Sequence, residues 1–235
     1  MHIIYYLPVC TFLLSLAFSI QLYHHWRQKS QALYLFWWLV GVLTYGAGTL
    51  TESLNTLLGW SELNFRLWYI SGALLGGAPL AQGTVYLLLK RPLAHLLTAI
   101  LVVVVISAAI CVSLSPIDYT KVDTLRMSGK VLTWQWVRYF SPFINVYALA
   151  FLAGGAVYSA IGYLSRTGTS HRFWGNLLIA VGALLPGIGG MATRFNFIEL
   201  LYITELVGLL LIYIAYRIMR AEPSPSIHAV QRMHA

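Results

Sequence analysis

The chain has 235 residues and a formal net charge of +8, with 59% apolar, 14% aromatic and only 9% charged residues. Its mean hydropathy is +0.72. A soluble domain carries about 25% charged residues, so this composition excludes a water-soluble fold and predicts an all-α integral membrane protein. Both cysteines, Cys10 and Cys111, lie within apolar runs, which excludes a disulfide-rich secreted scaffold and a cysteine-built metal or iron–sulfur site.

Long apolar runs predict the number of membrane-spanning helices. A bilayer core of about 30 Å requires roughly 20 apolar residues in a helix. Seven such runs occur, at about 4–23, 33–58, 65–89, 93–114, 131–163, 173–191 and 197–217. We therefore predict a seven-helix membrane domain over residues 1–219. The tail, 220–235, contains two prolines and scattered polar residues and is expected to be disordered.

The distribution of lysine and arginine predicts the orientation, because cytoplasmic loops are rich in these residues. One side holds Arg27, Lys29, Lys90, Arg91, Arg166, Arg172, Arg217, Arg220 and Arg232, with Glu222. The other side holds Arg66, Lys121, Arg126, Lys130, Arg138 and Arg194, balanced by Glu52, Glu62, Asp118, Asp123, Glu199 and Glu205. The amino terminus is then outside and the tail cytoplasmic, in a bacterial cytoplasmic (inner) membrane. The basic charge is explained by topology and by contact with anionic lipids rather than by nucleic-acid binding.

The first and last three predicted helices show a faint similarity. Three segments of the first half recur at nearly constant offsets: Tyr6-Leu7-Pro8 as Phe140-Ser141-Pro142, Phe36-Trp37 as Phe173-Trp174, and residues 67–71 as residues 200–204. Chance similarity between apolar helices is the alternative explanation. Two triplets joined by one helix would be parallel repeats.

Such a 3+1+3 arrangement resembles the seven-helix group that includes rhodopsin-like proteins, SWEET-like sugar carriers and the seven-helix sensor regions of bacterial kinases. Rhodopsins hold retinal on a lysine in the last helix. Residues 197–217 contain no lysine, which argues against a retinal Schiff base.

Polar residues within the membrane indicate a site, because their burial in lipid is costly. In the second helix, Gly41, Tyr45, Gly48, Glu52 and Asn55 follow helical spacing and share one face. Glu205 lies nine residues beyond Asn196, about 14 Å along a helix, and so needs a proton or a cation. We expect it to face the bundle interior and to pair with Arg138 first, then with Arg66 or Arg194, with Glu52 and Asn55 nearby. The predicted ligand-binding residues, in the outer half of the bundle, are Glu52, Asn55, Arg66, Tyr69, Arg138, Asn145, Tyr202 and Glu205.

Two explanations of this polar set remain open at this point, a ligand pocket and a purely structural ion-pair network. The small-residue faces of the third and sixth helices, among them Gly72, Gly76, Gly187 and Gly190, favour helix packing over a pocket. The loop at about 115–130 is expected outside, over part of the bundle mouth.

The sequence contains no nucleophile with a base, no paired catalytic carboxylates and no metal-ligand cluster on one side, which argues against an enzyme. No metal or other cofactor is predicted. The function we expect is a small-molecule carrier or receptor. The alternative is a non-catalytic accessory or lipid-binding subunit of a larger membrane complex. Expected partners are membrane lipids, and other membrane subunits or a second copy of the chain, but no nucleic acid.

Overall fold

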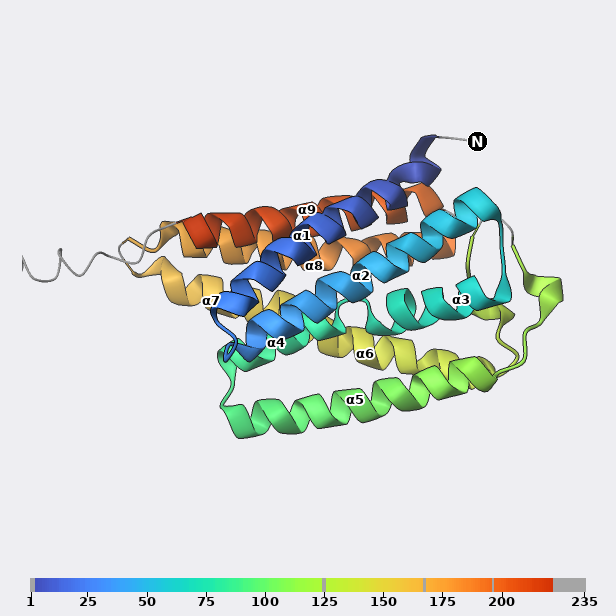
Figure 1. Cartoon of the computed structure of the whole chain (residues 1–235), viewed down its shortest axis with the longest axis horizontal. Helices are drawn as coiled ribbons and strands as arrows, with labels where there is room; N and C mark the ends of the chain where they lie inside the picture. Colours follow the sequence, from blue (N-terminus) through green and yellow to red (C-terminus); the bar gives the residue numbers. More distant parts are fainter. Residues whose placement is uncertain (1–2, 124–125, 167, 196, 222–235) are drawn as a thin grey trace, which may run out of the picture.

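The computed structural model describes residues 3–123, 126–166, 168–195 and 197–221, without the side chains of Ile3 and Arg194. The predicted tail lies outside the described residues, apart from Arg220 and Ala221 at the end of the last helix. The all-α prediction is confirmed, since the only β contact among the described residues is an isolated bridge between Ile117 and Leu132. The helices run side by side as an elongated bundle (Figure 1).

Six helical stretches are long and apolar enough to cross a membrane. They are α1 (Leu7–Gln28, preceded by the 3-10 turn η1, Ile3–Tyr6), α2 (Leu33–Leu58), α5 (Arg91–Leu114), the composite helix Gln135–Leu164, α8 (Ser170–Ala192) and α9 (Ile198–Ala221). These six helices indicate an integral membrane protein. Five of them correspond closely to predicted spans, and the composite helix begins four residues later than the predicted 131.

The third predicted span, 65–89, is interrupted. It consists of α3 (Glu62–Trp68), the π-helical turn η2 (Tyr69–Leu75) and α4 (Ala78–Leu88). Gly76 ends the π-helical turn with φ of 22°, a positive value that an L side chain rarely adopts. No single piece is long enough to span the bilayer, so the prediction of a seventh spanning helix and of a 3+1+3 repeat stays a prediction.

The composite helix also changes geometry along its length. A 3-10 segment, η5 (Gln135–Tyr139), leads into α6 (Phe140–Ala148), a π-helical turn η6 (Leu149–Gly154) and α7 (Gly155–Leu164). Residues 131–134, predicted as the start of this helix, instead belong to the connecting loop. That loop contains two further 3-10 turns, η3 (Tyr119–Lys121) and η4 (Gly129–Val131), and its ends are joined by the bridge between Ile117 and Leu132.

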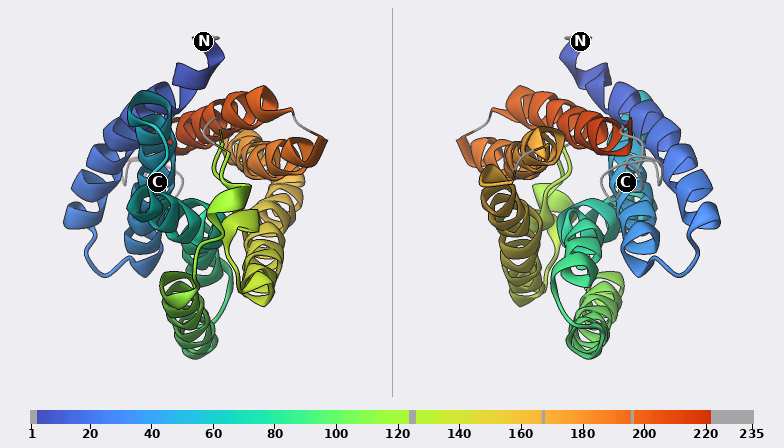
Figure 2. Two further views of the ribbon diagram at one scale, coloured as in Figure 1. Left: turned by 90° about the vertical axis from the view of Figure 1, so that its right-hand side faces the viewer. Right: turned by 90° about the vertical axis from the view of Figure 1, so that its left-hand side faces the viewer.

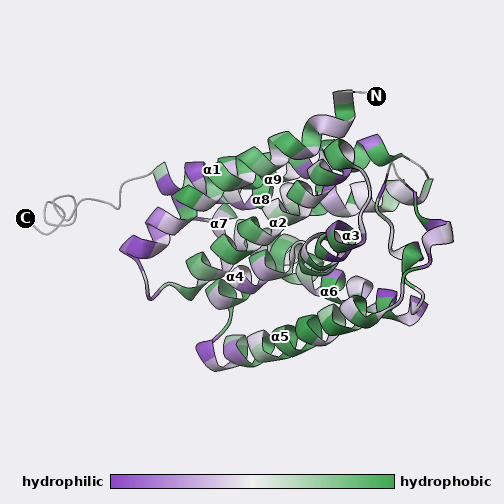
Figure 3. Ribbon diagram, turned by 45° about the vertical axis from the view of Figure 1, so that its right-hand side comes forward, coloured by the Kyte–Doolittle hydropathy of each residue, from purple (hydrophilic) through white to green (hydrophobic). Residues whose placement is uncertain are grey.

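The two ends of the bundle carry different connections. The start of α1, the α2–α3 turn and the 115–139 loop lie at one end, and the α1–α2, α4–α5 and α7–α8 turns lie with the end of α9 at the other (Figure 1). Polar residues concentrate toward both ends, whereas the middle of the helices is largely hydrophobic (Figure 3). This is the distribution a bilayer requires, and it matches the predicted grouping of the loops into two sides. We refer to the end with the 115–139 loop as the outer end, following the predicted orientation.

Helix α5 lies at the periphery. In the end views it stands apart from the arc formed by α1, α2, α8 and α9 (Figure 2). Only Ala94, Leu101, Ala108 and Val112 of its 24 residues are buried. Gln82 of α4, which is fully buried, attaches it to the bundle by donating to the Ala94 carbonyl and the Thr98 hydroxyl at 3.2 and 2.7 Å.

Candidate functional site

A partly open cavity of about 1280 Å³ lies between the helices of the bundle. Its walls come from α2, the interrupted third segment, α6, α8 and α9, and its outer boundary includes residues of the 115–139 loop, among them Arg126, Met127 and Lys130. In the other direction it extends along α9 as far as Ile212. Trp38 and Val85, which are buried and do not line the cavity, fill the bundle on the inner side.

Two carboxyl groups face each other in the cavity wall. Glu52 of α2 is only 6% exposed, and its carboxyl group is in hydrogen-bonding contact with that of Glu205 on α9. Trp68 Nε1 donates to Glu52 Oε1 at 3.0 Å. Neither Glu52 Oε2 nor Glu205 Oε2 receives a hydrogen bond from an N–H or O–H donor among the described residues. Two carboxylates in contact repel each other, so a proton or another cation must lie between them.

Backbone packing brings these carboxyl groups together. Gly48 lies one turn before Glu52, and a Cβ on it would be only 3.1 Å from Gly72 Cα. The absence of a side chain at Gly48 therefore lets α2 and the interrupted third segment touch, which puts Trp68 within reach of Glu52. On the other side, Tyr45 OH donates to the Glu205 backbone carbonyl at 3.0 Å and connects α2 to α9.

Aromatic side chains surround the carboxyl pair. Tyr45, Trp68, Tyr69 and Tyr202 all line the cavity. The ring of Tyr202 lies 6.1 Å from that of Tyr5 in an edge-to-face arrangement, and the hydroxyl of Tyr5 donates to Glu199 at 3.4 Å. The cavity wall thus contains aromatic rings and carboxyl groups together, a combination that attracts cations.

The interruption of the third segment also borders the cavity. Gly76 and Gly77 line it, next to Ala73. The Ala73 carbonyl accepts from Ser141 Oγ at 2.6 Å and from Asn145 Nδ2 at 3.5 Å. Because these α6 side chains replace a helical hydrogen bond, the backbone can leave α geometry at membrane depth without an unsatisfied carbonyl.

The outer mouth of the cavity is basic. Arg126, Lys130 and Arg138 line it. Arg126 pairs with Asp123 at 3.5 Å and donates to the Thr193 carbonyl at 3.1 Å, which ties the loop to the end of α8. Arg138 donates to Gln135 Oε1 at 2.7 Å. Positive charge at the mouth therefore contrasts with the carboxyl pair deeper inside.

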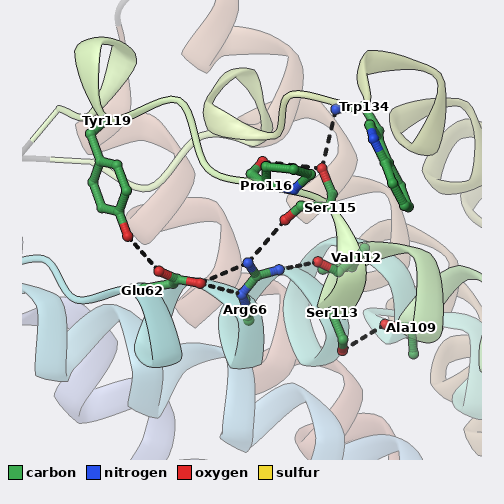
Figure 4. A network of polar contacts seen from close by, with 9 residues as sticks. All are labelled: Glu62, Arg66, Ala109, Val112, Ser113, Ser115, Pro116, Tyr119 and Trp134. Atoms are coloured by element: carbon green, nitrogen blue, oxygen red, sulfur yellow. Dashed lines mark hydrogen bonds and ion pairs between the residues drawn. The ribbon is translucent and has the colours of Figure 1, made fainter.

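Arg66 occupies a separate polar cluster, shown in Figure 4. It is bonded to Glu62 Oε1 through Nε and Nη2, at 3.0 and 2.7 Å, and donates to the backbone carbonyls of Val112 and Ser115 at the end of α5. Glu62 Oε2 accepts from Tyr119 OH at 2.5 Å. These two partners, Tyr119 first and then Arg66, lower the pKa of Glu62. We call this set of contacts the Arg66 clasp.

The structure brings seven of the eight predicted ligand-binding residues into one cavity wall: Glu52, Asn55, Tyr69, Arg138, Asn145, Tyr202 and Glu205. Arg66, the eighth, does not line the cavity because its guanidinium group is bound within the clasp. Whether these residues bind a ligand stays a prediction.

The prediction of an ion pair between Glu205 and Arg138 or Arg66 is wrong. Both arginines have other acceptors, and the Glu205 carboxyl contacts Glu52 instead. The side chain of Arg194, the third expected partner, lies outside the described residues.

The packing face predicted for the sixth helix is also shifted. Gly182 and Gly189 of α8 approach the α9 backbone, whereas a Cβ on Gly187 or Gly190 would meet nothing within 4 Å. Pro186 packs against Gly208, with 3.1 Å between its Cδ and the position of a Cβ there.

Sequence reasoning expected Glu52 near Glu205, but as a neighbour of an arginine ion pair and not in contact with the Glu205 carboxyl group. Glu52 lies six residues before the end of α2 and Glu205 seven residues after the start of α9. At a rise of 1.5 Å per residue, both are roughly 10 Å from the outer end. Equal depth on two polar faces is a signal for proximity.

The described residues contain no group of three or more His, Cys, Asp or Glu side chains that could hold a metal ion. Both cysteines are free thiols. Neither a protein-family model, nor a curated protein, nor a solved structure matches the chain.

Proposed function

We propose that this protein binds a small molecule in the central cavity and acts as a receptor or carrier in the bacterial cytoplasmic membrane. The observation that carries the proposal is the cavity itself, with a carboxyl pair in its wall that has no cationic partner among the residues the structure describes. Its volume of about 1280 Å³ exceeds the roughly 300–1000 Å³ of common small-molecule sites. A bundle held together only by packing has no need for such a space.

The interrupted third segment supports a binding role. Membrane carriers commonly form their sites where a helix is broken at mid-membrane, because the break places backbone polar groups beside the ligand. Here the break at Gly76 borders the cavity and is supported by Ser141 and Asn145 from another helix. The break, the carboxyl pair and the loop-covered mouth belong to one continuous wall.

Ligand retention can be tested with two matched tryptophan variants. Gly187 lines the cavity, and a side chain there has open space around its Cβ; Gly162 on α7 has equally open surroundings but does not line the cavity. Wild type, Gly187→Trp and Gly162→Trp would be purified in native lipid and extracted, and the retained small molecules quantified by mass spectrometry.

We expect a molecule retained by wild type and Gly162→Trp to fall at least tenfold in Gly187→Trp, since the indole occupies its space. Equal retention in all three proteins would refute the proposal. Flux of the identified molecule into proteoliposomes then separates a carrier from a receptor, because a carrier must open the inner side now filled by Trp38 and Val85.

A further inference from the structure

We propose that the ligand is an amine with an apolar body, and that its ammonium group binds between the carboxyl groups of Glu52 and Glu205. This inference rests on the proposed function and names the chemical class of the ligand. It concerns a pair of groups in direct contact with no arginine, lysine or histidine in hydrogen-bonding contact among the described residues.

Charge balance is the first argument. Glu52 is 94% buried, as its 6% exposure shows, and a buried carboxylate without a cation is costly. When the two carboxyl groups share one proton, they carry a single negative charge together. One ammonium group neutralises that charge and brings N–H donors to a pair whose oxygens Glu52 Oε2 and Glu205 Oε2 accept no hydrogen bond among the described residues.

The neighbouring groups favour a cation over an anion. Toward the pair, α2 presents Tyr45 and Asn55, α3 presents Trp68, and α9 presents Tyr202. These are neutral side chains, and three of them are aromatic rings that attract ammonium groups. The remaining acid nearby, Glu199, is bonded to Tyr5 and does not line the cavity.

The basic residues of the mouth are the strongest argument for an anionic ligand. Lys130 and Arg138 are exposed, so water and salt already stabilise and screen their charges. Glu52 and the Glu205 Oε2 atom are buried, and no basic side chain among the described residues compensates their charge. A ligand therefore gains more from neutralising the buried pair than from approaching the mouth.

The apolar part of the ligand has a matching wall. Five of the exposed cavity-lining residues on α6, η6 and α8 are large and hydrophobic: Val146, Leu149, Leu184, Ile188 and Met191. An aromatic or hydrocarbon body along this wall removes apolar surface from water, which is favourable at about 25 cal/mol per Å². An amine with such a body can also dissolve in the bilayer and so avoid the basic mouth.

The test compares three probes that share a phenylethyl body and differ in their head group: 2-phenylethylamine, 2-phenylethanol and 3-phenylpropionate. Dissociation constants would be measured by titration calorimetry with the protein in nanodiscs of zwitterionic lipid, against empty nanodiscs. We expect the amine to bind at least tenfold more tightly than the alcohol or the acid. Equal or tighter binding of either would overturn the proposal, and this comparison needs only the wild-type protein.

Variants then locate the ammonium site. Glu52→Gln and Glu205→Gln should each weaken amine binding at least tenfold, whereas Glu199→Gln, on the same helix as Glu205 but outside the cavity wall, should leave it unchanged. Amine binding that is insensitive to both cavity variants would place the ammonium group elsewhere and refute the assignment. If the amine does not bind preferentially but Gly187→Trp still abolishes retention of a native molecule, only the proposed ligand class is wrong. If Gly187→Trp also leaves retention unchanged, the proposed function is wrong as well.

Discussion

Replacement of Arg66 by alanine tests whether the Arg66 clasp attaches α5 to the bundle. Arg66 is 16% exposed at its side chain and donates to two carbonyls at the last turn of α5, Val112 and Ser115. Those carbonyls have no partner within their own helix, and the positive charge also complements the negative end of the α5 dipole. With few buried residues of its own, α5 depends on such end contacts.

The expected loss can be worked from these contacts. Hydrogen bonds to a charged group contribute about 1.5–3 kcal/mol each. Water at the outer end can replace part of these hydrogen bonds for the freed carbonyls. We therefore expect the free energy of unfolding to fall by about 2 kcal/mol for the two bonds together. At roughly 2–4 °C per kcal/mol for a chain of this size, Arg66→Ala should lower the midpoint of thermal unfolding by roughly 4–8 °C.

The assay is thermal unfolding in detergent, followed by intrinsic tryptophan fluorescence. Lys121→Ala is the control, because the ion pair of Lys121 with Asp118 joins an exposed side chain to a half-exposed one within the loop. Its loss should give no measurable shift of the unfolding midpoint. An Arg66→Ala protein as stable as wild type, or equal shifts in both variants, would show that the clasp does not hold α5.

The clasp also has a pH dependence of known sign. The hydrogen bonds from Tyr119 and Arg66 hold the pKa of Glu62 below its ordinary value of 4.5. Their stabilisation is therefore complete above pH 4.5 and is lost as the pH falls through the lower folded-state value. Asp118, whose pKa is lowered to about 2 by Lys121 and Thr120, titrates alike in wild type and in Glu62→Gln. The unfolding midpoint of Glu62→Gln should thus depend less on pH between 5 and 3; an unchanged dependence contradicts this reasoning.

Two further predictions concern the helix break and the topology. Gly76→Ala should lower the midpoint of thermal unfolding more than Gly59→Ala. Both residues have positive φ, but only a Cβ on Gly76 would approach a backbone oxygen, that of Gly72, at 2.8 Å. Equal shifts would show that the break tolerates a side chain. In a protein without its two native cysteines, a cysteine at Thr120→Cys should react with an impermeant maleimide on intact cells, and one at Ser165→Cys should not. The reverse labelling pattern would show that the predicted orientation in the membrane is wrong.

The sequence predicted most of the spans because long apolar runs are sufficient for them. The second helix was predicted at 33–58, and α2 has those bounds. The third segment could not be predicted in the same way. Its hydropathy stays high through Gly76 and Gly77, since glycine and alanine do not lower it, while the hydrogen bonds that stabilise the break come from Ser141 and Asn145, about 70 residues away. A local pattern contains no information on such contacts.

The candidate site shows the same division between local and distant information. The α2 face with Tyr45, Gly48 and Glu52 was visible as a helical stripe and does line the cavity. The partner of Glu205 was predicted wrongly because a buried carboxylate usually pairs with a cation such as arginine. In the structure Arg66 instead binds the end of α5 and Arg138 binds Gln135. The carboxyl groups of Glu52 and Glu205 contact each other.

This outcome connects the stability of the bundle to the chemistry of the site. Two arginines near the outer end bind other groups. Arg66 donates to the Ser115 carbonyl at the end of α5. Arg126 pairs with Asp123 and donates to the Thr193 carbonyl. If either guanidinium group reached the carboxyl pair, it would neutralise the pair permanently and remove any preference for a cationic ligand. The cavity can favour a cationic ligand because none of the described arginine or lysine side chains pairs with Glu52 or Glu205. The same separation explains why the Arg66 clasp should govern unfolding while Glu52 and Glu205 govern binding.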